Sequence, residues 1–90
     1  MMDEDEIDRF LAAIRAKVED RIREQLARHH RVNPNIDPRH VIEIQIKQEG
    51  ERLERSADKY EDEGKDNMAE LCRSLAEEWL PELSQILQRR

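Results

Sequence analysis

The stretch SADKYEDEGKDNMAELCRSLAEEWLP, residues 56–81, decides the fold of this chain. Small and apolar residues recur at helical spacing on both sides of Gly64, which divides the stretch. Glycine readily takes the left-handed conformation that ends many helices, and Asp66 or Asn67 can cap the helix that follows. Pro81 should end or kink that helix, because it lacks the N–H of one helical hydrogen bond. The stretch therefore predicts a tight hairpin of two helices.

The helix after the glycine has the clearest amphipathic pattern in the chain. Its apolar residues recur at steps of three and four, and they are Met68, Leu71, Cys72, Leu75, Ala76, Trp79 and Leu80. This spacing predicts a helix over residues 66–80 with one buried face. Three further apolar residues, Leu83, Ile86 and Leu87, predict a short final helix over residues 81–89.

A long amphipathic helix is predicted at the start of the chain. Asp3 can cap it, with Glu6 three residues later completing a capping box. One apolar stripe then continues at steps of three and four, through Ile7, Phe10, Leu11, Ile14, Val18, Ile22 and Leu26. The pattern predicts a helix over residues 4–29.

The segment RVNPNIDP interrupts the helical pattern, because it contains two prolines four residues apart. Asp37 followed by Pro38 is a typical helix start, with the aspartate as the cap and the proline in the first turn. A second helix is therefore predicted over residues 38–62. Val32 and Ile36 are expected to fill the end of the bundle between the two helices.

Three features of the second helix leave alternatives open. Ile42, Ile44 and Ile46 alternate with polar residues as in a strand, but later apolar residues return to helical spacing and favour a helix. Glu49 falls on the apolar stripe, where we expect it to turn toward solvent or to pair with an arginine. Gly50 indicates a close helix contact or a kink, since glycine weakens a helix interior.

These elements predict an all-α fold with a single domain, residues 1–90. The expected architecture is a three-helix up-down-up bundle whose third helix is kinked or broken at Pro81, because short connections make neighbouring helices antiparallel. Charged residues make up 42% of the 90 and aromatic ones 3%, so the core of one chain must be thin. We therefore expect the bundle to form an oligomer.

The composition also argues against several classes of protein. A net charge of -6 disfavours a general nucleic-acid binder, which needs an excess of Lys and Arg to neutralise phosphates. The chain has no apolar run near the roughly 20 residues of a membrane span, and its single cysteine cannot form an internal disulfide. We expect a cytoplasmic protein with no membrane partner.

Few residues are candidates for metal or catalytic chemistry. His29, His30 and His40 flank the predicted loop, Glu43 lies three residues after His40, and Glu49 is the remaining candidate ligand. No HExxH or paired ligand motif supports a metal site, so solvated loop histidines are the favoured interpretation, and no cofactor is expected.

The sequence also gives little support for a catalytic site. Cys72 lies on the apolar stripe without a CxxC partner, which is typical of a core residue, and the chain has no phosphate-binding loop or GxSxG motif. We therefore expect a protein that is not an enzyme.

Two family resemblances fall on the hairpin. Seven residues stand at the spacings of a tetratricopeptide repeat, namely Leu53, Ala57, Tyr60, Gly64, Ala69, Ala76 and Pro81, while Ser56 and Arg73 depart from that pattern. This resemblance covers about 34 residues of the chain and implies the geometry of one helical hairpin. Stacked repeats normally need three or more copies.

The hairpin also resembles the GatB/YqeY-like helical family of tRNA-dependent amidotransferases over about residues 53–84. The matching residues are Ser56, Tyr60, Gly64, Lys65, Asn67, Met68, Ala69 and Glu70, followed by Trp79, Leu80, Pro81, Leu83 and Ser84. Lys65 stands where the family has an arginine. The resemblance implies an accessory module that contacts tRNA, and Lys59, Lys65 and Arg73 are the cations that could make this contact.

Three functional hypotheses follow. The first is a small non-enzymatic interaction or adaptor protein that binds a second copy of itself or a larger protein through an apolar helix face. The predicted interaction surface consists of Val41, Ile44, Trp79, Leu80, Leu83 and Ile86. The second hypothesis is the tRNA-associated module, and the third is a metal-binding helical oligomer that uses Glu49 and the histidines.

Overall fold

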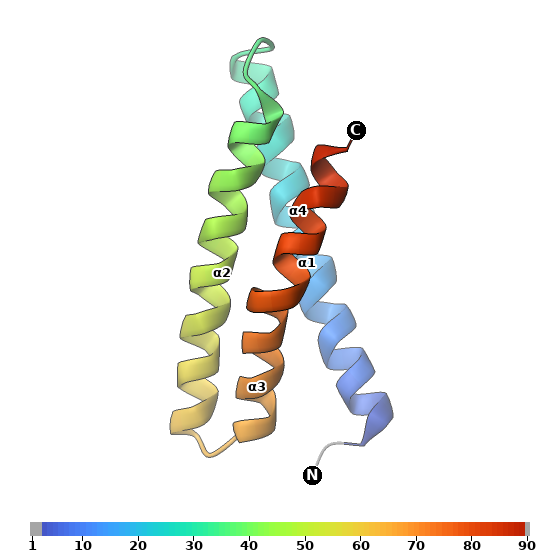
Figure 1. The fold of residues 1–90 in the computed structure, drawn as a ribbon, viewed down its shortest axis with the longest axis vertical. Helices are drawn as coiled ribbons and strands as arrows, with labels where there is room; N and C mark the ends of the chain where they lie inside the picture. Colours follow the sequence, from blue (N-terminus) through green and yellow to red (C-terminus); the bar gives the residue numbers. More distant parts are fainter. Residues whose placement is uncertain (1–2, 90) are drawn as a thin grey trace.

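The computed structural model describes residues 3–89, which contain helices joined by short turns and no strand (Figure 1). The elements are α1 (Glu4–Val32), α2 (Pro38–Asp62), α3 (Asp66–Ser74), the π-helix η1 (Leu75–Trp79) and α4 (Leu80–Gln88). The predicted all-helical class is confirmed. α1 and α2 meet at the end of the molecule that contains residues 33–37, which we call the loop end. α2 and α3 meet at the opposite end, which we call the hairpin end.

The predicted start of α1 is confirmed, but its predicted end is wrong. The Asp3 side chain accepts a hydrogen bond from the backbone N–H of Glu6 at 2.8 Å, as its capping position predicts. The helix then continues to Val32, three residues past the expected end. Val32 is 83% exposed, so the prediction that it fills the end of the bundle is wrong. Ile36 is half-buried.

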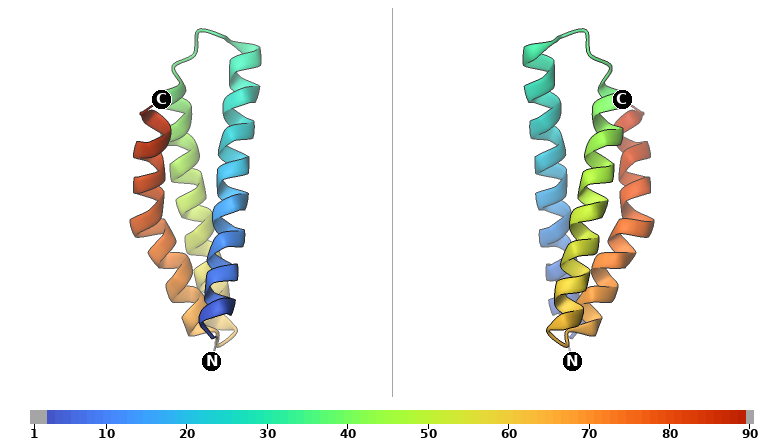
Figure 2. Two further views of the ribbon diagram at one scale, coloured as in Figure 1. Left: turned by 90° about the vertical axis from the view of Figure 1, so that its right-hand side faces the viewer. Right: turned by 90° about the vertical axis from the view of Figure 1, so that its left-hand side faces the viewer.

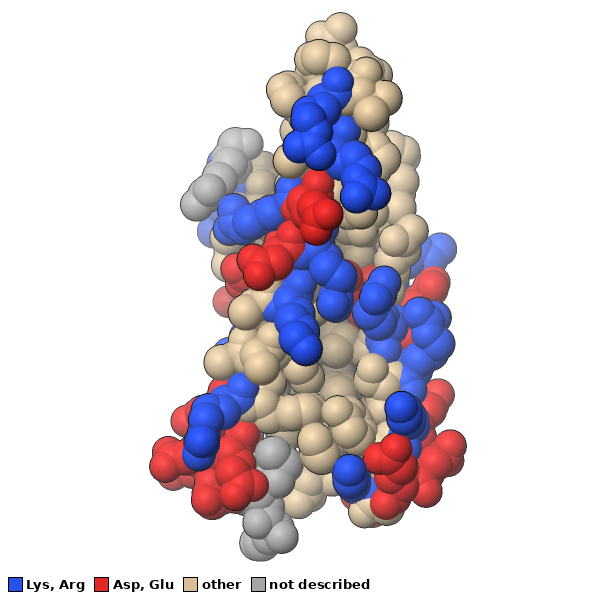
Figure 3. Space-filling view, turned by 180° about the vertical axis from the view of Figure 1, so that it is seen from behind, with Lys and Arg blue, Asp and Glu red and all other residues tan. Residues whose placement is uncertain are grey.

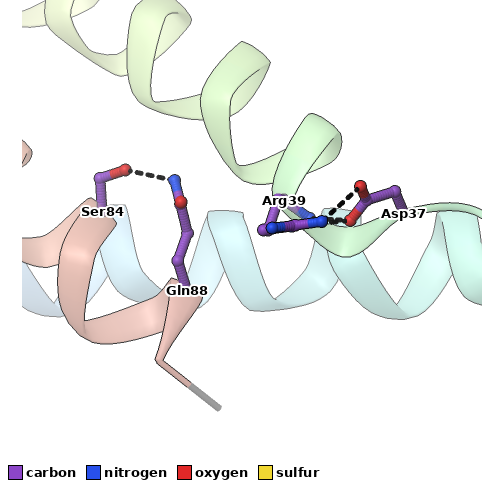
Figure 4. Close-up of polar contacts among 4 residues, drawn as sticks. All are labelled: Asp37, Arg39, Ser84 and Gln88. Atoms are coloured by element: carbon purple, nitrogen blue, oxygen red, sulfur yellow. Dashed lines mark hydrogen bonds and ion pairs between the residues drawn. The ribbon is translucent and has the colours of Figure 1, made fainter.

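α2 begins as the Asp-Pro pair predicts. Asp37 accepts a hydrogen bond from the backbone N–H of Arg39 at 3.0 Å, and Pro38 occupies the first turn. The Arg39 guanidinium also reaches the Asp37 carboxylate, with both distances at 3.4 Å (Figure 4). The isoleucines with strand-like alternation are helical, and Ile42 is buried while Ile44 is exposed. The preference for a helix over a strand at these residues is confirmed.

The turn between α2 and α3 depends on Gly64. Its φ angle of 76° lies in the left-handed region, which glycine adopts without steric cost. The backbone N–H of Lys65 then donates to the carbonyl of Tyr60 at 2.8 Å and closes the end of α2. Lys65 precedes α3 and makes no side-chain cap, while Asp66 is the first residue of that helix. The predicted cap by Asp66 or Asn67 is therefore wrong.

The third helical segment departs from a regular α-helix just before Pro81, where the sequence predicted a kink or break at the proline itself. The regular α-helix ends at Ser74, and the π-helical turn η1 follows it. The backbone N–H of Leu80 donates to the carbonyl of Leu75, five residues earlier, and α4 begins with Pro81 in its first turn. Single π turns and prolines both bend helices. The segment therefore changes direction without losing its helical course (Figure 2).

The core lies between α2 and the segment α3–η1–α4, with the middle of α1 packed on it. It is built by Val18, Ile22, Leu53, Ala57, Ala69, Cys72, Leu75, Leu80 and Leu83. At the hairpin end the rings of Phe10 and Tyr60 meet edge to face, with 6.0 Å between their centroids. The molecule measures 48 × 24 × 18 Å, so the core is a narrow strip along a rod.

Candidate interaction groove between α1 and α2

An open groove runs between α1 and α2 on one side of the rod. Its larger part, toward the loop end, has a volume of about 560 Å³ and is lined by Arg21, Glu24, Gln25, His29, Ile36, His40, Val41, Ile44, Gln45, Gln48, Glu49 and Arg52. A smaller hollow of about 190 Å³ shares Arg21 and Arg52 and reaches Tyr60 toward the hairpin end. We call the two hollows together the α1–α2 groove. Its residues come from helices far apart in the sequence, and nothing in their spacing revealed it.

A partly buried ion pair forms the floor of this groove. The Nε and Nη2 atoms of Arg21 donate to the two carboxylate oxygens of Glu49 at 2.6 and 2.7 Å. Glu49 is only 3% exposed, whereas the Arg21 side chain is 38% exposed. The Nε atom of Arg52 lies 3.9 Å from the same carboxylate. Glu49 is therefore held between two arginines, one from each wall of the groove.

The pair explains why a carboxylate can occupy the apolar stripe of α2. Two-pronged contact between a guanidinium and a carboxylate supplies several charge-assisted hydrogen bonds at once. The hydrogen bond to Glu49 raises the pKa of Arg21 above its ordinary value. Among the described residues, no buried side-chain nitrogen or oxygen lacks a hydrogen-bond partner. The expected pairing of Glu49 with an arginine is confirmed, but its depth of burial was not foreseen.

The predicted interaction residues divide into two groups. Val41, Leu80 and Leu83 are buried within the chain itself, so they do not present the interaction surface predicted for them. Ile44 is 43% exposed and lines the groove, while Ile86 is 49% exposed on α4. The exposed apolar residues therefore lie on two different parts of the surface.

Trp79, the remaining predicted interaction residue, is half-buried away from the groove. The guanidinium carbon of Arg15 lies 5.8 Å from the centre of a Trp79 ring. A cation over an aromatic face stabilises the pair electrostatically. Trp79 therefore contributes to the contact between α1 and η1.

The candidate metal ligands do not converge. His29 and His40 line the α1–α2 groove from opposite walls, whereas His30 and Glu43 are exposed and do not line it. Glu49 is committed to its arginines. Within residues 3–89, no three His, Cys, Asp or Glu side chains are placed so that they could hold a metal ion.

Cys72 is fully buried in the core, and its burial raises the pKa of the thiol. A raised pKa keeps the thiol protonated and therefore weakly nucleophilic. The position on the apolar stripe predicted this core role.

Two of the cations that could contact tRNA lie close to carboxylates. Arg73 donates to Glu61 at 2.6 Å and to Asp58 at 3.3 Å, and these contacts raise the pKa of Arg73. Lys65 lies 3.4 Å from Glu63. The surroundings of these cations at the hairpin end are therefore acidic.

Charge is distributed unevenly along the rod (Figure 3). Acidic side chains concentrate at the hairpin end, while Lys and Arg side chains extend through the middle toward the loop end. Residues 21–48 contain six Lys and Arg, three Asp and Glu, and all three histidines, although the whole chain has a net charge of -6. This stretch, which forms the loop end and most of the lining of the larger hollow, is therefore more basic than the rest of the chain.

No family model matches the chain, and searches of curated proteins and of solved structures returned no significant match. None of the helices in the described part of the chain is both long enough and apolar enough to cross a membrane.

Proposed function

We propose that this protein is a small non-enzymatic interaction module that binds a helix of another polypeptide in the α1–α2 groove. The bound chain is a second copy or a larger protein, and we place the complex in the cytoplasm. The single observation that carries the proposal is the open groove between α1 and α2, which both apolar and polar side chains line. A fourth helix lying there would complete a four-helix arrangement, which is a common way to bury apolar faces.

The lining of the groove matches the anatomy of a binding surface. Its accessible apolar side chains, Ile36 and Ile44, lie beside polar residues that include Gln45 and Gln48. Binding surfaces commonly combine an apolar centre with a polar rim whose groups donate and accept hydrogen bonds. Amphipathic helices bind such grooves through one apolar face. This lining supports a helix as the bound element.

Photo-crosslinking from within the groove tests the proposal. A benzophenone amino acid placed at Gln48, which is exposed beside the groove, should capture a second copy or a larger protein. The same amino acid at Gln85, exposed on α4, is the matched control. Capture from Gln48 but not Gln85 is the expected result. Equal capture from both residues, or none from Gln48, would contradict the proposed site.

The tRNA-associated module remains the alternative proposal, and it rests on the resemblance of residues 53–84. It predicts binding to tRNA that weakens steeply with salt and depends on Lys59, Lys65 and Arg73. The carboxylates around Arg73 oppose an approaching phosphate backbone. A gel shift at low salt, lost in the Arg73→Glu variant, would favour this alternative over the interaction module.

A further inference from the structure

The two ends of the rod carry opposite charge on exposed side chains. At the hairpin end, α1 begins with an acidic run that includes Asp5 and Asp8, and α2 ends with Asp62. At the loop end, Arg28 and Arg31 are exposed on the last turns of α1. The α1–α2 groove extends between these ends along the long axis of the molecule. A partner helix lying in the groove therefore meets basic groups at one end and acidic groups at the other.

This chain itself presents the complementary arrangement. A second copy laid along the groove in the opposite direction brings its acidic end to the basic end of the first copy, and its basic end to the acidic one. Both attractive contacts form together because the two rods have the same length, 48 Å. A foreign protein would have to reproduce this charge spacing, whereas a second copy has it already. A parallel arrangement would instead bring like charges together.

The dimer would use most of one long side of the rod, because a standard stable interface buries roughly 800 Å² per partner and the rod is 48 Å long and 18 Å across its narrowest dimension. An antiparallel pair related by a two-fold axis is closed, so no further copies add to it. The expected assembly is a dimer and not a filament.

We infer that the α1–α2 groove is the interface of an antiparallel homodimer, in which the acidic hairpin end of each copy contacts the basic loop end of the other. The inference rests on the proposed function and specifies its partner. Attraction between the ends orients the two copies, because electrostatic complementarity contributes mainly to orientation and to the rate of encounter.

Complementary charge reversals test this arrangement. One variant carries Asp8→Lys and Asp62→Lys and makes the hairpin end more basic. The other carries Arg28→Glu and Arg31→Glu and makes the loop end more acidic. In an antiparallel dimer each variant weakens the attraction between its own copies, but an equimolar mixture again pairs unlike ends at both contacts. Sedimentation velocity over a dilution series measures the mass of each sample, and circular dichroism verifies that each is folded.

The wild type should form a dimer that dissociates more readily as salt rises, because salt screens the attraction between the ends. Each variant alone should dimerise at least about tenfold more weakly than the wild type, and the mixture should regain the dimer mass. A wild type that is monomeric at every concentration would overturn the inference, as would variants that dimerise as well as the wild type, or a mixture that stays monomeric. The salt response of the wild type needs no variant, so a misfolded variant would not leave the inference without a test.

The two proposals fail in different ways. If the wild type is monomeric but the crosslinker at Gln48 captures a larger protein, the groove is a binding site and only the homodimer is wrong. If the chain is monomeric and the crosslinker captures nothing, both proposals are wrong.

Discussion

α2 contacts α1 in a different way from α3. Toward α3 it presents Ala57, which is fully buried and packs in the core with Ala69 and Cys72. Small side chains let helix axes approach closely, and this side is packed. Toward the loop-end half of α1 the same helix contributes the buried Glu49, its contact with Arg21, and one wall of an open groove. One side of α2 packs into the core, and the other side lines an open groove.

The difference shows how a chain with few apolar residues can form a core and still leave an open groove on its surface. The packed side gathers most of the buried aliphatic and small residues into one strip. The open side is held by an ion pair whose hydrogen bonds fix the relative position of α1 and α2. Such a pair orients the helices without filling the space between them. Changes on the two sides should therefore have different consequences.

The largest effect is expected from Leu80→Ala on the packed side. Leu80 is 1% exposed, and removal of a buried leucine side chain costs about 3 kcal/mol of unfolding free energy, from lost burial and the cavity left behind. Urea unfolding followed by circular dichroism measures it. Ile86→Ala, at an exposed residue of the same helix, is the control and should cost less than about 1 kcal/mol. Equal losses from both variants would contradict the packing described for α4.

Arg21→Met should have the next largest effect, because it leaves the buried Glu49 carboxylate without its closest partner. We expect a loss of about 2 kcal/mol of unfolding free energy, less than for a fully buried pair because Arg52 lies nearby. The double variant Arg21→Met with Glu49→Leu should recover most of this loss, since no unpaired buried charge remains. A double-mutant cycle, measured by urea unfolding, gives the coupling free energy between Arg21 and Glu49. A value of zero would exclude an ion pair that holds α1 to α2.

The two glycines should respond in opposite directions to alanine. A Cβ atom added at Gly50 would lie 3.7 Å from Cδ1 of Leu80, which is an ordinary contact, so Gly50→Ala should stabilise the helix by about 1 kcal/mol. Gly64 has a positive φ angle, so Gly64→Ala should destabilise by about 1 kcal/mol. Thermal unfolding of both variants provides the comparison. A destabilising Gly50→Ala would mean that α2 and α4 are closer than described.

The smallest effect concerns the cap of α2 at the loop end. The hydrogen bond from the backbone N–H of Arg39, with that from its side chain, lowers the pKa of Asp37 below the ordinary 3.8. Because the pKa is lower in the folded state, the stabilisation is complete above this ordinary value. It is lost as pH falls through the lower folded value. Asp37→Asn keeps a capping side chain that does not titrate, so the stability of this variant should lack the loss on acidification that Asp37 contributes. Identical acid-unfolding profiles for the wild type and the variant would contradict this prediction.

The sequence predicted local structure better than contacts between helices. The caps at Asp3 and Asp37 and the turn at Gly64 depend on residues a few positions apart, and all three are in the structure. The end of α1 was misplaced because nothing in the segment before Pro34 forbids another helical turn. At Pro81 the bend was foreseen, but the π turn before it was not. A π turn depends on the fit of neighbouring helices, which local spacing does not contain.

The candidate site was less predictable. Glu49 stood out on the apolar stripe, yet its partner Arg21 lies 28 residues away in the sequence, and several other arginines were equally eligible. Val41, Leu80 and Leu83 were assigned to a surface because the number of apolar residues does not reveal which helix covers them. Only the packing of the helices against one another distinguishes a buried apolar residue from an exposed one.

A residue-resolved dilution series by NMR tests the central claim most directly, namely that the α1–α2 groove is the face on which this protein binds another chain. As concentration rises, amide shifts should change mainly at residues that line the groove, such as Gln25, Ile44 and Gln48, and change little on the exposed face of α4. Changes that concentrate around Ile86 on α4, or spectra that do not change at any concentration, would contradict a homodimer formed through the groove.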